Sequence, residues 1–206
     1  MKVNLNHQLN NPEIKGVEIL SIGTELLLGN IVNTNAQWIS EELSSLGLNH
    51  FRQSTIGDNS NRIIKLIKEI SSRSNLLITT GGLGPTPDDL TIEAIAKSFN
   101  TQLYEREYLW DEIKKKVSLS SSNLNHSSLK KQCFFPKSAQ IINNPTGTAP
   151  GMIWEPISGF TILTFPGVPS EMKAMWKETA VDYIKKNFSD GYIFFSCNLK
   201  FAGIGE

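Results

Sequence analysis

A glycine-rich loop followed by two acidic residues is the strongest chemical signal in this sequence. The segment Thr79–Thr91 reads TTGGLGPTPDDLT and comes directly after a short apolar run. Glycines at Gly81, Gly82 and Gly84 let backbone N–H groups approach an anion closely, and the N-terminus of a following helix adds a favourable dipole. The segment therefore predicts a phosphate-binding loop. It is neither a Walker A loop nor a dinucleotide-binding fingerprint, because it lacks both the GKS or GKT ending and the GxGxxG spacing.

Two adjacent carboxylates, Asp88 and Asp89, follow the glycines at the expected start of the next helix. One aspartate there would serve as a helix N-cap, which is the purely structural explanation. A second carboxylate beside a phosphate is placed to hold a divalent metal ion that bridges two phosphates, or to position a water. We expect a chemical role for at least one of the two.

Further polar residues follow the first predicted strand. In the segment GTELLLG, from Gly23 to Gly29, Thr24 and Glu25 emerge at the carboxyl edge of the predicted sheet, where ligands bind in folds of this class. No helix-capping position requires Glu25. Asn33 comes just before the next helix, where capping and ligand binding are equally good explanations for it.

Asp58 lies between the second predicted strand and its helix. An N-cap and a catalytic carboxylate are about equally expected there, because Asp58 shares the sheet edge with Asp89 and Glu25. The later loop NPTGTAPG, from Asn144 to Gly151, resembles a substrate-contacting loop through the residues Thr146, Gly147 and Thr148.

One further loop, FPGVPSEM from Phe165 to Met172, is largely explained by the start of a helix. Pro169 suits the first turn of that helix, and Glu171 is favourable near its positive end.

The elements that must position these loops alternate in the first half of the chain. Apolar runs and helical spacings indicate strands at Val17–Ile22, Leu48–Ile56 and Leu76–Thr80, and helices at Thr34–Leu46, around Ile63–Ile70 and at Leu90–Phe99. This alternation predicts a parallel, doubly wound sheet with ligands at the carboxyl ends of its strands.

The second half is less regular. It predicts helices at Tyr104–Leu119 and Pro169–Asn187, a Ser/Asn-rich loop at Ser118–Ser128, and strands at Ala139–Ile142, Gly151–Trp154, Phe160–Phe165 and Tyr192–Phe201. We expect a flexible tail over residues 1–15, one nucleotide-binding domain over 16–190, and the start of a truncated linking region over 191–206.

Composition excludes several classes of protein. The sequence holds 20 Lys+Arg against 20 Asp+Glu, which argues against nucleic-acid binding by phosphate neutralisation. The basic run Lys114–Lys116 lies among acidic residues and is interpreted as a solvated helix face. No stretch is long and apolar enough to be a signal peptide or a membrane span.

Cysteine and histidine usage points to a cytoplasmic protein without thiol chemistry. Cys133 and Cys197 are far apart and show neither a disulfide framework nor a metal-ligand spacing. Neither has an evident histidine partner, so a thiol hydrolase is disfavoured. Carboxylates acting with a divalent metal are the chemistry that the residues permit.

Taken together, the four loops resemble the N-terminal domain of the CinA family, which is similar to the molybdopterin-binding fold of MogA and MoaB. GTELLLG, GGLGPTPDDLT, NPTGTAPG and FPGVPSEM occur in the family's order, and the resemblance runs from about Val17 to Phe201. It implies a three-layer α/β/α fold with a mostly parallel central sheet and a small β-containing subregion. In longer relatives the final FAGIGE leads through a linking domain to an amidase domain, so amidase activity is not expected here.

The resemblance also implies hydrolysis of the pyrophosphate of ADP-ribose, or of a related nucleotide, to AMP and ribose 5-phosphate with Mg²⁺ or Co²⁺. Asp89 and Asp58 would be catalytic, and Asp89, Asp88 and Glu25 would hold the metal. The nucleotide and its phosphates would contact the residues Gly81, Gly82, Gly84, Thr24, Asn33, Thr146, Gly147 and Thr148. Asn59 stands where many relatives carry another acid, which weakens any scheme that needs a carboxylate pair there. Related folds self-associate, so a homo-oligomer is expected.

Two other functions remain open at this stage. A molybdopterin-binding or adenylyltransferase domain would use the same glycine loop and Asp89. A non-catalytic nucleotide-sensing module would bind the ligand without turnover. The GPTPDD and NPTGTAPG segments resemble CinA more than MogA.

Overall fold

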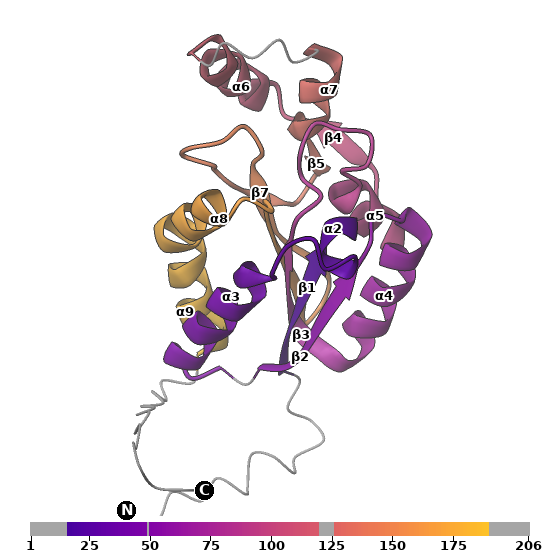
Figure 1. The fold of residues 1–206 in the computed structure, drawn as a ribbon, viewed down its shortest axis with the longest axis vertical. Helices are drawn as coiled ribbons and strands as arrows, with labels where there is room; N and C mark the ends of the chain where they lie inside the picture. The colour runs from indigo at the N-terminus through magenta and orange to yellow at the C-terminus, as the bar shows by residue number, and fades with distance from the viewer. Residues whose placement is uncertain (1–15, 49, 120–125, 190–206) are drawn as a thin grey trace, which may run out of the picture.

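A six-stranded sheet lies between two layers of helices (Figure 1). The computed structural model describes residues 16–48, 50–119 and 126–189. The predicted three-layer α/β/α fold with a mostly parallel sheet is confirmed. The expected tail at 1–15, the strand expected at Tyr192–Phe201 and the linking region expected at 191–206 lie outside the described residues.

The strand order brings the predicted chemical loops to one edge of the sheet. The order is β2-β1-β3-β8-β7-β6, formed by His50–Ile56, Gly16–Ile22, Ser74–Thr80, Phe160–Phe165, Gly151–Ile157 and Gln140–Ile142. The first four strands are parallel neighbours, whereas β7 runs antiparallel to both β8 and β6. Ile22 is in register with Ile56, and Thr80 with Phe165. The segments that follow these residues therefore emerge side by side.

Helices cover both faces of the sheet through apolar residues spaced three or four apart. The helices α3 (Thr34–Ser45), α8 (Pro169–Met175) and α9 (Val181–Phe188) lie on one face, and α4 (Ser60–Arg73) and α5 (Thr91–Ser98) on the other (Figure 1). The predicted face of α4 is confirmed, because Ile63, Ile67 and Ile70 are fully buried. Each such side chain contributes about 1.5–3 kcal/mol of hydrophobic free energy.

The helix predicted at Pro169–Asn187 is interrupted. A π-helical segment, Trp176–Ala180, separates α8 from α9. Trp176 is fully buried there, with its ring centroid 5.8 Å from those of Trp38 and Phe165. The wider turn lies where this large, fully buried side chain enters the core, and apolar periodicity alone does not reveal such a break.

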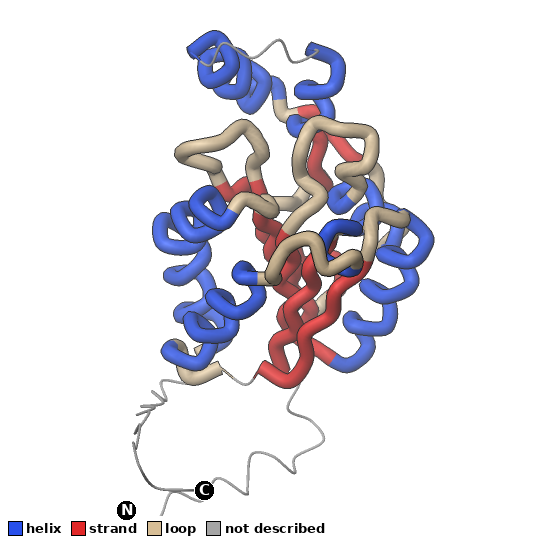
Figure 2. Tube along the Cα trace, in the orientation of Figure 1, coloured by secondary structure: helices blue, strands red, loops and turns tan. Residues whose placement is uncertain are grey.

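A small subregion extends beyond the sheet at the end where the site loops lie (Figure 2). It contains the antiparallel strands β4 (Leu103–Glu105) and β5 (Phe134–Pro136), the helices α6 (Glu107–Leu119) and α7 (His126–Lys130), and a 3-10 turn, η1, at Lys131–Cys133. The helix predicted from Tyr104 therefore begins three residues later, because Tyr104 pairs with Phe135. Of the loop predicted at Ser118–Ser128, the described residues at its two ends belong to α6 and α7, and residues 120–125 lie outside the described ones. Among the described helices, none has the length and apolar character needed to cross a membrane.

Candidate functional site

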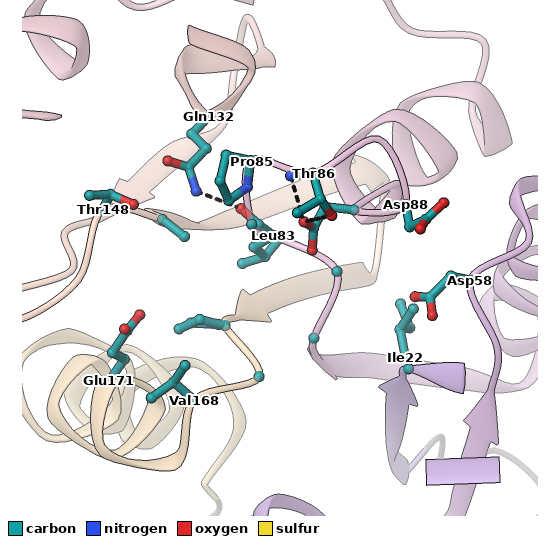
Figure 3. A pocket seen from close by; sticks show the side chains of 18 of the residues that line it. Ile22, Asp58, Leu83, Pro85, Thr86, Asp88, Gln132, Thr148, Val168 and Glu171 are labelled. Atoms are coloured by element: carbon teal, nitrogen blue, oxygen red, sulfur yellow. Dashed lines mark hydrogen bonds between the residues drawn. The ribbon is translucent and has the colours of Figure 1, made fainter. Parts of the chain in front are cut away.

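A cleft of about 530 Å³ lies at the carboxyl edge of the sheet, between the glycine loop and the start of α8. Figure 3 shows Asp58 and Asp88 on one side of this cleft and Thr148 and Glu171 on the other. The structure brings together in its lining the predicted residues Glu25, Asp58, Gly81, Gly82, Gly84, Asp88, Asp89 and Thr148. Four predicted residues do not line it, namely Thr24, Asn33, Thr146 and Gly147.

Thr24 holds Asp58 in place. It is the first residue of the short helix α2 (Thr24–Leu27), which Gly23 separates from the end of β1. Its backbone N–H and its hydroxyl both donate to Asp58 Oδ2, each at 2.8 Å. The Asp58 N–H in turn donates to Thr24 Oγ1 at 3.1 Å. These bonds occupy Oδ2 and leave Oδ1 of Asp58 for another partner.

Thr86 holds Asp89 in the same way. The Thr86 N–H donates to Asp89 Oδ2 at 2.9 Å, and the Thr86 hydroxyl donates to the same oxygen at 2.5 Å. The cleft thus contains two aspartates that are each held by a threonine through one carboxylate oxygen. Asp89 Oδ1, like Asp58 Oδ1, has no hydrogen-bond partner among the described residues.

Helix capping does not explain any of the three aspartates of the cleft. The N-cap of α5 is Leu90, which makes no side-chain capping bond. The N-cap of α4 is Asn59, whose side chain accepts from the Arg62 N–H. The purely structural explanations of Asp58, Asp88 and Asp89 as caps are therefore wrong, whereas the capping explanation of Asn33 is confirmed by its bond from the Ala36 N–H.

The glycine loop offers backbone donors to the cleft. Gly81 and Gly82 have φ angles of 100° and 65°, which favour glycine. A Cβ at Gly81 would collide with Ile22 O, and a Cβ at Gly82 would collide with the Thr91 hydroxyl. The sequence predicted that the N–H of Gly81 would bind a phosphate. This N–H instead donates to Phe165 O at 3.0 Å and is therefore not available to a ligand. Within the described chain, the N–H groups of Gly82, Leu83 and Gly84 make no hydrogen bond and remain for a ligand.

The predicted loop at Asn144–Gly151 is organised by a residue that the sequence did not single out. Asn144 Oδ1 accepts from the N–H groups of Thr146 and Gly147 at 3.1 and 2.7 Å. Its Nδ2 donates to Glu171 Oε2 at 2.7 Å. The amides of Thr146 and Gly147 are thus used inside the loop. Of the three predicted residues here, Thr148 is the one that lines the cleft.

Glu171 is a second residue missed by sequence reasoning. It was explained by its position at the start of α8, yet its side chain lines the cleft opposite Asp58 (Figure 3). A Cβ at Gly147 would collide with its carboxylate. The FPGVPSEM motif contains Glu171, but the favourable position of an acid at the start of a helix explained its presence equally well.

The turn η1 supplies two more residues that were missed. Gln132 Nε2 donates to Leu83 O at 3.0 Å, and Gln132 lines the cleft above the glycine loop (Figure 3). Lys131 Nζ donates to Thr86 O at 3.3 Å and to Asp89 O. Both residues therefore brace the loop that carries Asp88 and Asp89. No motif marks them, because the contact depends on the irregular subregion.

The charge of the cleft is strongly one-sided. Five carboxylates line it, from Glu25, Asp58, Asp88, Asp89 and Glu171, and no Lys or Arg side chain is among its described lining residues. None of the five forms a salt bridge within the described part of the chain. The described residues also contain no preassembled group of three acidic, histidine or cysteine ligands for a metal.

Thiol chemistry at Cys133 is disfavoured by the structure as well as by the sequence. Cys133 is fully buried, and burial raises the pKa of its thiol to about 11, with a smaller contribution from Glu105. A thiol with that pKa is almost entirely protonated near neutral pH and is a poor nucleophile. Cys197 lies outside the described residues.

Comparison with known families and proteins gives consistent matches. Residues 18–186 match the family described as a probable molybdopterin binding domain. A CinA-like protein from Prochlorococcus marinus subsp. pastoris is 85% identical over all 206 residues. Another, from a Synechococcus species, is 56% identical over 94% of this chain. The chain spans about half the length of these relatives, 48% and 46% respectively.

Solved structures extend the comparison to the fold. The protein CinA of unknown function from Thermoplasma acidophilum has a TM-score of 0.74 and 35% identity, over 82% of this chain and 97% of that one. The molybdopterin biosynthesis enzyme MoaB from Thermus thermophilus has a TM-score of 0.51 and 17% identity, over 86% and 100% of the two chains. At that identity the likeness to MoaB concerns the fold alone.

Proposed function

Because this chain belongs to the CinA family and carries its molybdopterin-binding-type domain, we propose that the acidic cleft binds a nucleotide pyrophosphate with a divalent metal ion and hydrolyses it. ADP-ribose is the proposed substrate, with water adding to one phosphorus and the bridging P–O bond breaking. The products are AMP and ribose 5-phosphate.

One observation supports this proposal above all others. Gly82, Leu83 and Gly84, whose amides make no hydrogen bond within the described chain, line a cleft whose charged lining residues are all carboxylates. Backbone N–H groups suit phosphate oxygens, but a pyrophosphate among five carboxylates would be repelled. A divalent cation between the two sets of anions removes that conflict. The residues present therefore fit a ligand that is a metal–pyrophosphate complex.

The arrangement of the carboxylates is compatible with Mg²⁺. This ion usually keeps several waters and is bound by one or two carboxylates together with substrate phosphates. Such an ion needs no group of three protein ligands, and the described residues hold no such group. Asp89, through its unoccupied Oδ1, would hold the metal, with Asp88 and Glu25 as further ligands. When bound, the ion would neutralise charge on the pyrophosphate oxygens.

The remaining steps fall to groups of the chain itself. The amides of Gly82, Leu83 and Gly84 would fix one phosphate, and Thr148 would contact the nucleotide from the opposite wall. Asp58 Oδ1 would accept a hydrogen bond from the attacking water and orient it, because Thr24 holds the other oxygen. Positioning and electrostatic stabilisation of this kind are the main contributions that proteins make to phosphoryl transfer.

Two alternatives use the same cleft. The match to a probable molybdopterin binding domain favours a pterin-binding or adenylyltransferase function, in which the glycine loop would hold the pterin's phosphate. A sensing module would bind the nucleotide without hydrolysis. Both alternatives predict binding, but neither predicts the release of AMP from ADP-ribose.

One assay separates the three functions. The 206-residue chain is incubated with ADP-ribose and Mg²⁺ or Co²⁺, and AMP is measured by chromatography. The proposal expects AMP in the presence of metal and none after chelation. Tight binding of ADP-ribose without AMP would contradict hydrolysis in favour of the sensor. Adenylylation of molybdopterin, with no AMP from ADP-ribose, would favour the enzyme of pterin metabolism.

A further inference from the structure

A small recess of about 90 Å³ adjoins the main cleft. The two share the lining residues Ile22, Glu25, Gly81 and Gly167, so the recess adjoins the beginning of the glycine loop. Its wall is formed by the start of α3 and the segment before it. Of the recess residues, Glu25 alone takes part in the proposed hydrolysis, as a metal ligand.

Asn35, in the first turn of α3, lines the recess and is 7% exposed. Its Nδ2 donates to Thr80 Oγ1 and to Gly167 O, each at 2.9 Å. Thr80 Oγ1 donates its own hydrogen to Pro166 O at 2.9 Å, so it can only accept from Asn35. Gly167 O is also an acceptor. The amide orientation is therefore fixed, with Nδ2 on the side of Thr80.

This orientation leaves Asn35 Oδ1 buried and without a partner among the described residues. A buried acceptor without a donor is unfavourable, and native proteins rarely keep one without a reason. Since the side chain cannot flip without losing two bonds, the unpaired atom that Asn35 contributes beside the recess is an acceptor. A ligand suited to it must bring an N–H or O–H donor.

The rim of the recess is aliphatic and solvent-exposed. Ile31 and Val32 line it with 53% and 80% of their surface exposed, and Leu26 and Pro169 complete the apolar part of the wall. Exposed aliphatic groups beside a polar cleft are typical of ligand-binding surfaces. A flat apolar group in the recess would cover them.

We propose that this recess is the subsite for the nucleoside of a nucleoside 5′-phosphate. The base packs on Ile31 and Val32, and an amino group of the base or a hydroxyl of the ribose donates to Asn35 Oδ1. A phosphate is not the occupant, because Asn35 Oδ1 is an acceptor and the residues with free loop amides, Gly82, Leu83 and Gly84, do not line the recess. This inference rests on the proposed function only in placing a phosphate at the glycine loop next to the recess.

The test measures binding rather than hydrolysis. Dissociation constants are determined by calorimetry, in Mg²⁺, for AMP, IMP, 2′-deoxy-AMP and 3′-deoxy-AMP. The subsite predicts that at least one ligand lacking a donor binds about tenfold or more weakly than AMP. Weak binding of IMP identifies the base amino group as the donor, and weak binding of a deoxynucleotide identifies the hydroxyl. Equal binding of all four ligands would overturn the proposal.

Two variants tie this discrimination to the recess. Asn35→Leu should reduce the difference between AMP and the weaker ligand to within about twofold. Thr80→Val removes a partner of the same amide but keeps Oδ1, so it should preserve the discrimination even if it lowers stability. Full discrimination in Asn35→Leu would contradict the assignment.

Val32→Ser tests the apolar rim without disturbing the core, because Val32 is exposed. It should weaken AMP binding roughly fivefold and leave binding of inorganic pyrophosphate unchanged. Leu28→Ser is the matched control, since Leu28 is 69% exposed in the same segment but does not line the recess. Equal effects of the two substitutions on AMP would contradict the proposed contact.

The failure of this inference is distinguishable from failure of the proposed function. If AMP is released from ADP-ribose but the discrimination among ligands is absent, the hydrolase stands and the subsite is wrong. If no AMP is released but discrimination depends on Asn35, the subsite stands and hydrolysis is wrong.

Discussion

The buried carboxylate of Glu18 and the five carboxylates of the cleft differ in whether a cation is paired with them. Glu18, near the amino end of β1, is 3% exposed and accepts from Arg73 Nε at 2.7 Å, from Arg73 Nη2 at 2.8 Å and from the Ser74 hydroxyl at 2.5 Å. At the other end of the same sheet, the five cleft carboxylates have no cationic partner among the described residues. Glu18 is neutralised by the fold, whereas the cleft retains its charge.

The difference separates a structural carboxylate from carboxylates available to a ligand. Burial alone would raise the pKa of Glu18, but the hydrogen bonds from Arg73 and Ser74 outweigh burial and lower it. In the cleft, threonine hydroxyls and backbone amides fix two aspartates through one oxygen each and leave the other oxygen free. We infer that the charge of the cleft is balanced by what binds there.

The largest expected effect is on catalysis. Asp89→Asn should lower AMP release from ADP-ribose by roughly 1,000-fold, because it removes the charge nearest the glycine loop. Asparagine can still accept from Thr86, so the melting temperature should change by less than about 2 °C. The exposed Asp182→Asn on α9 serves as the control and should leave the rate unchanged. Full activity of Asp89→Asn would contradict the assignment.

Glu18→Gln should produce the opposite pattern, with lower stability and intact chemistry. Loss of the buried ion pair should cost about 2–3 kcal/mol of unfolding free energy, below the usual range for buried pairs because Arg73 is 32% exposed and can be hydrated. That corresponds to a fall of roughly 5–10 °C in the melting temperature. Turnover per folded molecule, measured well below the transition, should match wild type. A selective loss of turnover would remove the distinction between the two groups.

Low pH should lower the unfolding free energy of the wild-type chain, because Glu18 becomes protonated. Because its pKa is lower in the folded chain than the ordinary value of 4.5, Glu18 contributes stability above about pH 4.5 that is lost as the pH falls through its folded pKa. Denaturant midpoints measured from about pH 7 to about pH 3 should therefore converge for wild type and Glu18→Gln. A constant gap between the two proteins across that range would show that the pair does not titrate as described.

A smaller effect is expected at the threonine that holds Asp89. Thr86→Val keeps the backbone bond but loses the hydroxyl bond to Asp89, and kcat should fall about tenfold with little change in KM. Thr86→Ser restores a hydroxyl and should recover most of the rate. If Ser and Val behave alike, the hydroxyl does not position the carboxylate.

Sequence reasoning located the fold and one wall of the cleft because both follow from local patterns. Ile63, Ile67 and Ile70 repeat at helical spacing, and the glycines come directly after a buried strand. Parallel strand order then brings Asp58 and Asp89 to one edge without further information.

The remaining features depend on contacts between distant parts of the chain. Gln132 and Lys131 reach the glycine loop because β4 pairs with β5 about 30 residues later, which no local pattern encodes. Glu171 had an adequate explanation as a helix-start residue. The hydrogen bond from the Gly81 N–H to Phe165 O forms because β8 lies beside β3, and this pairing cannot be predicted from the local sequence.

The central claim is that the charge of the cleft is completed by a divalent metal bound together with pyrophosphate. Its most direct test is calorimetric titration of the wild-type chain with inorganic pyrophosphate, in Mg²⁺ and after chelation with EDTA. The account predicts binding in Mg²⁺ that weakens by about 100-fold or more in EDTA, and that Asp89→Asn largely removes this dependence. Equally tight binding of pyrophosphate to the wild type with and without metal would contradict it.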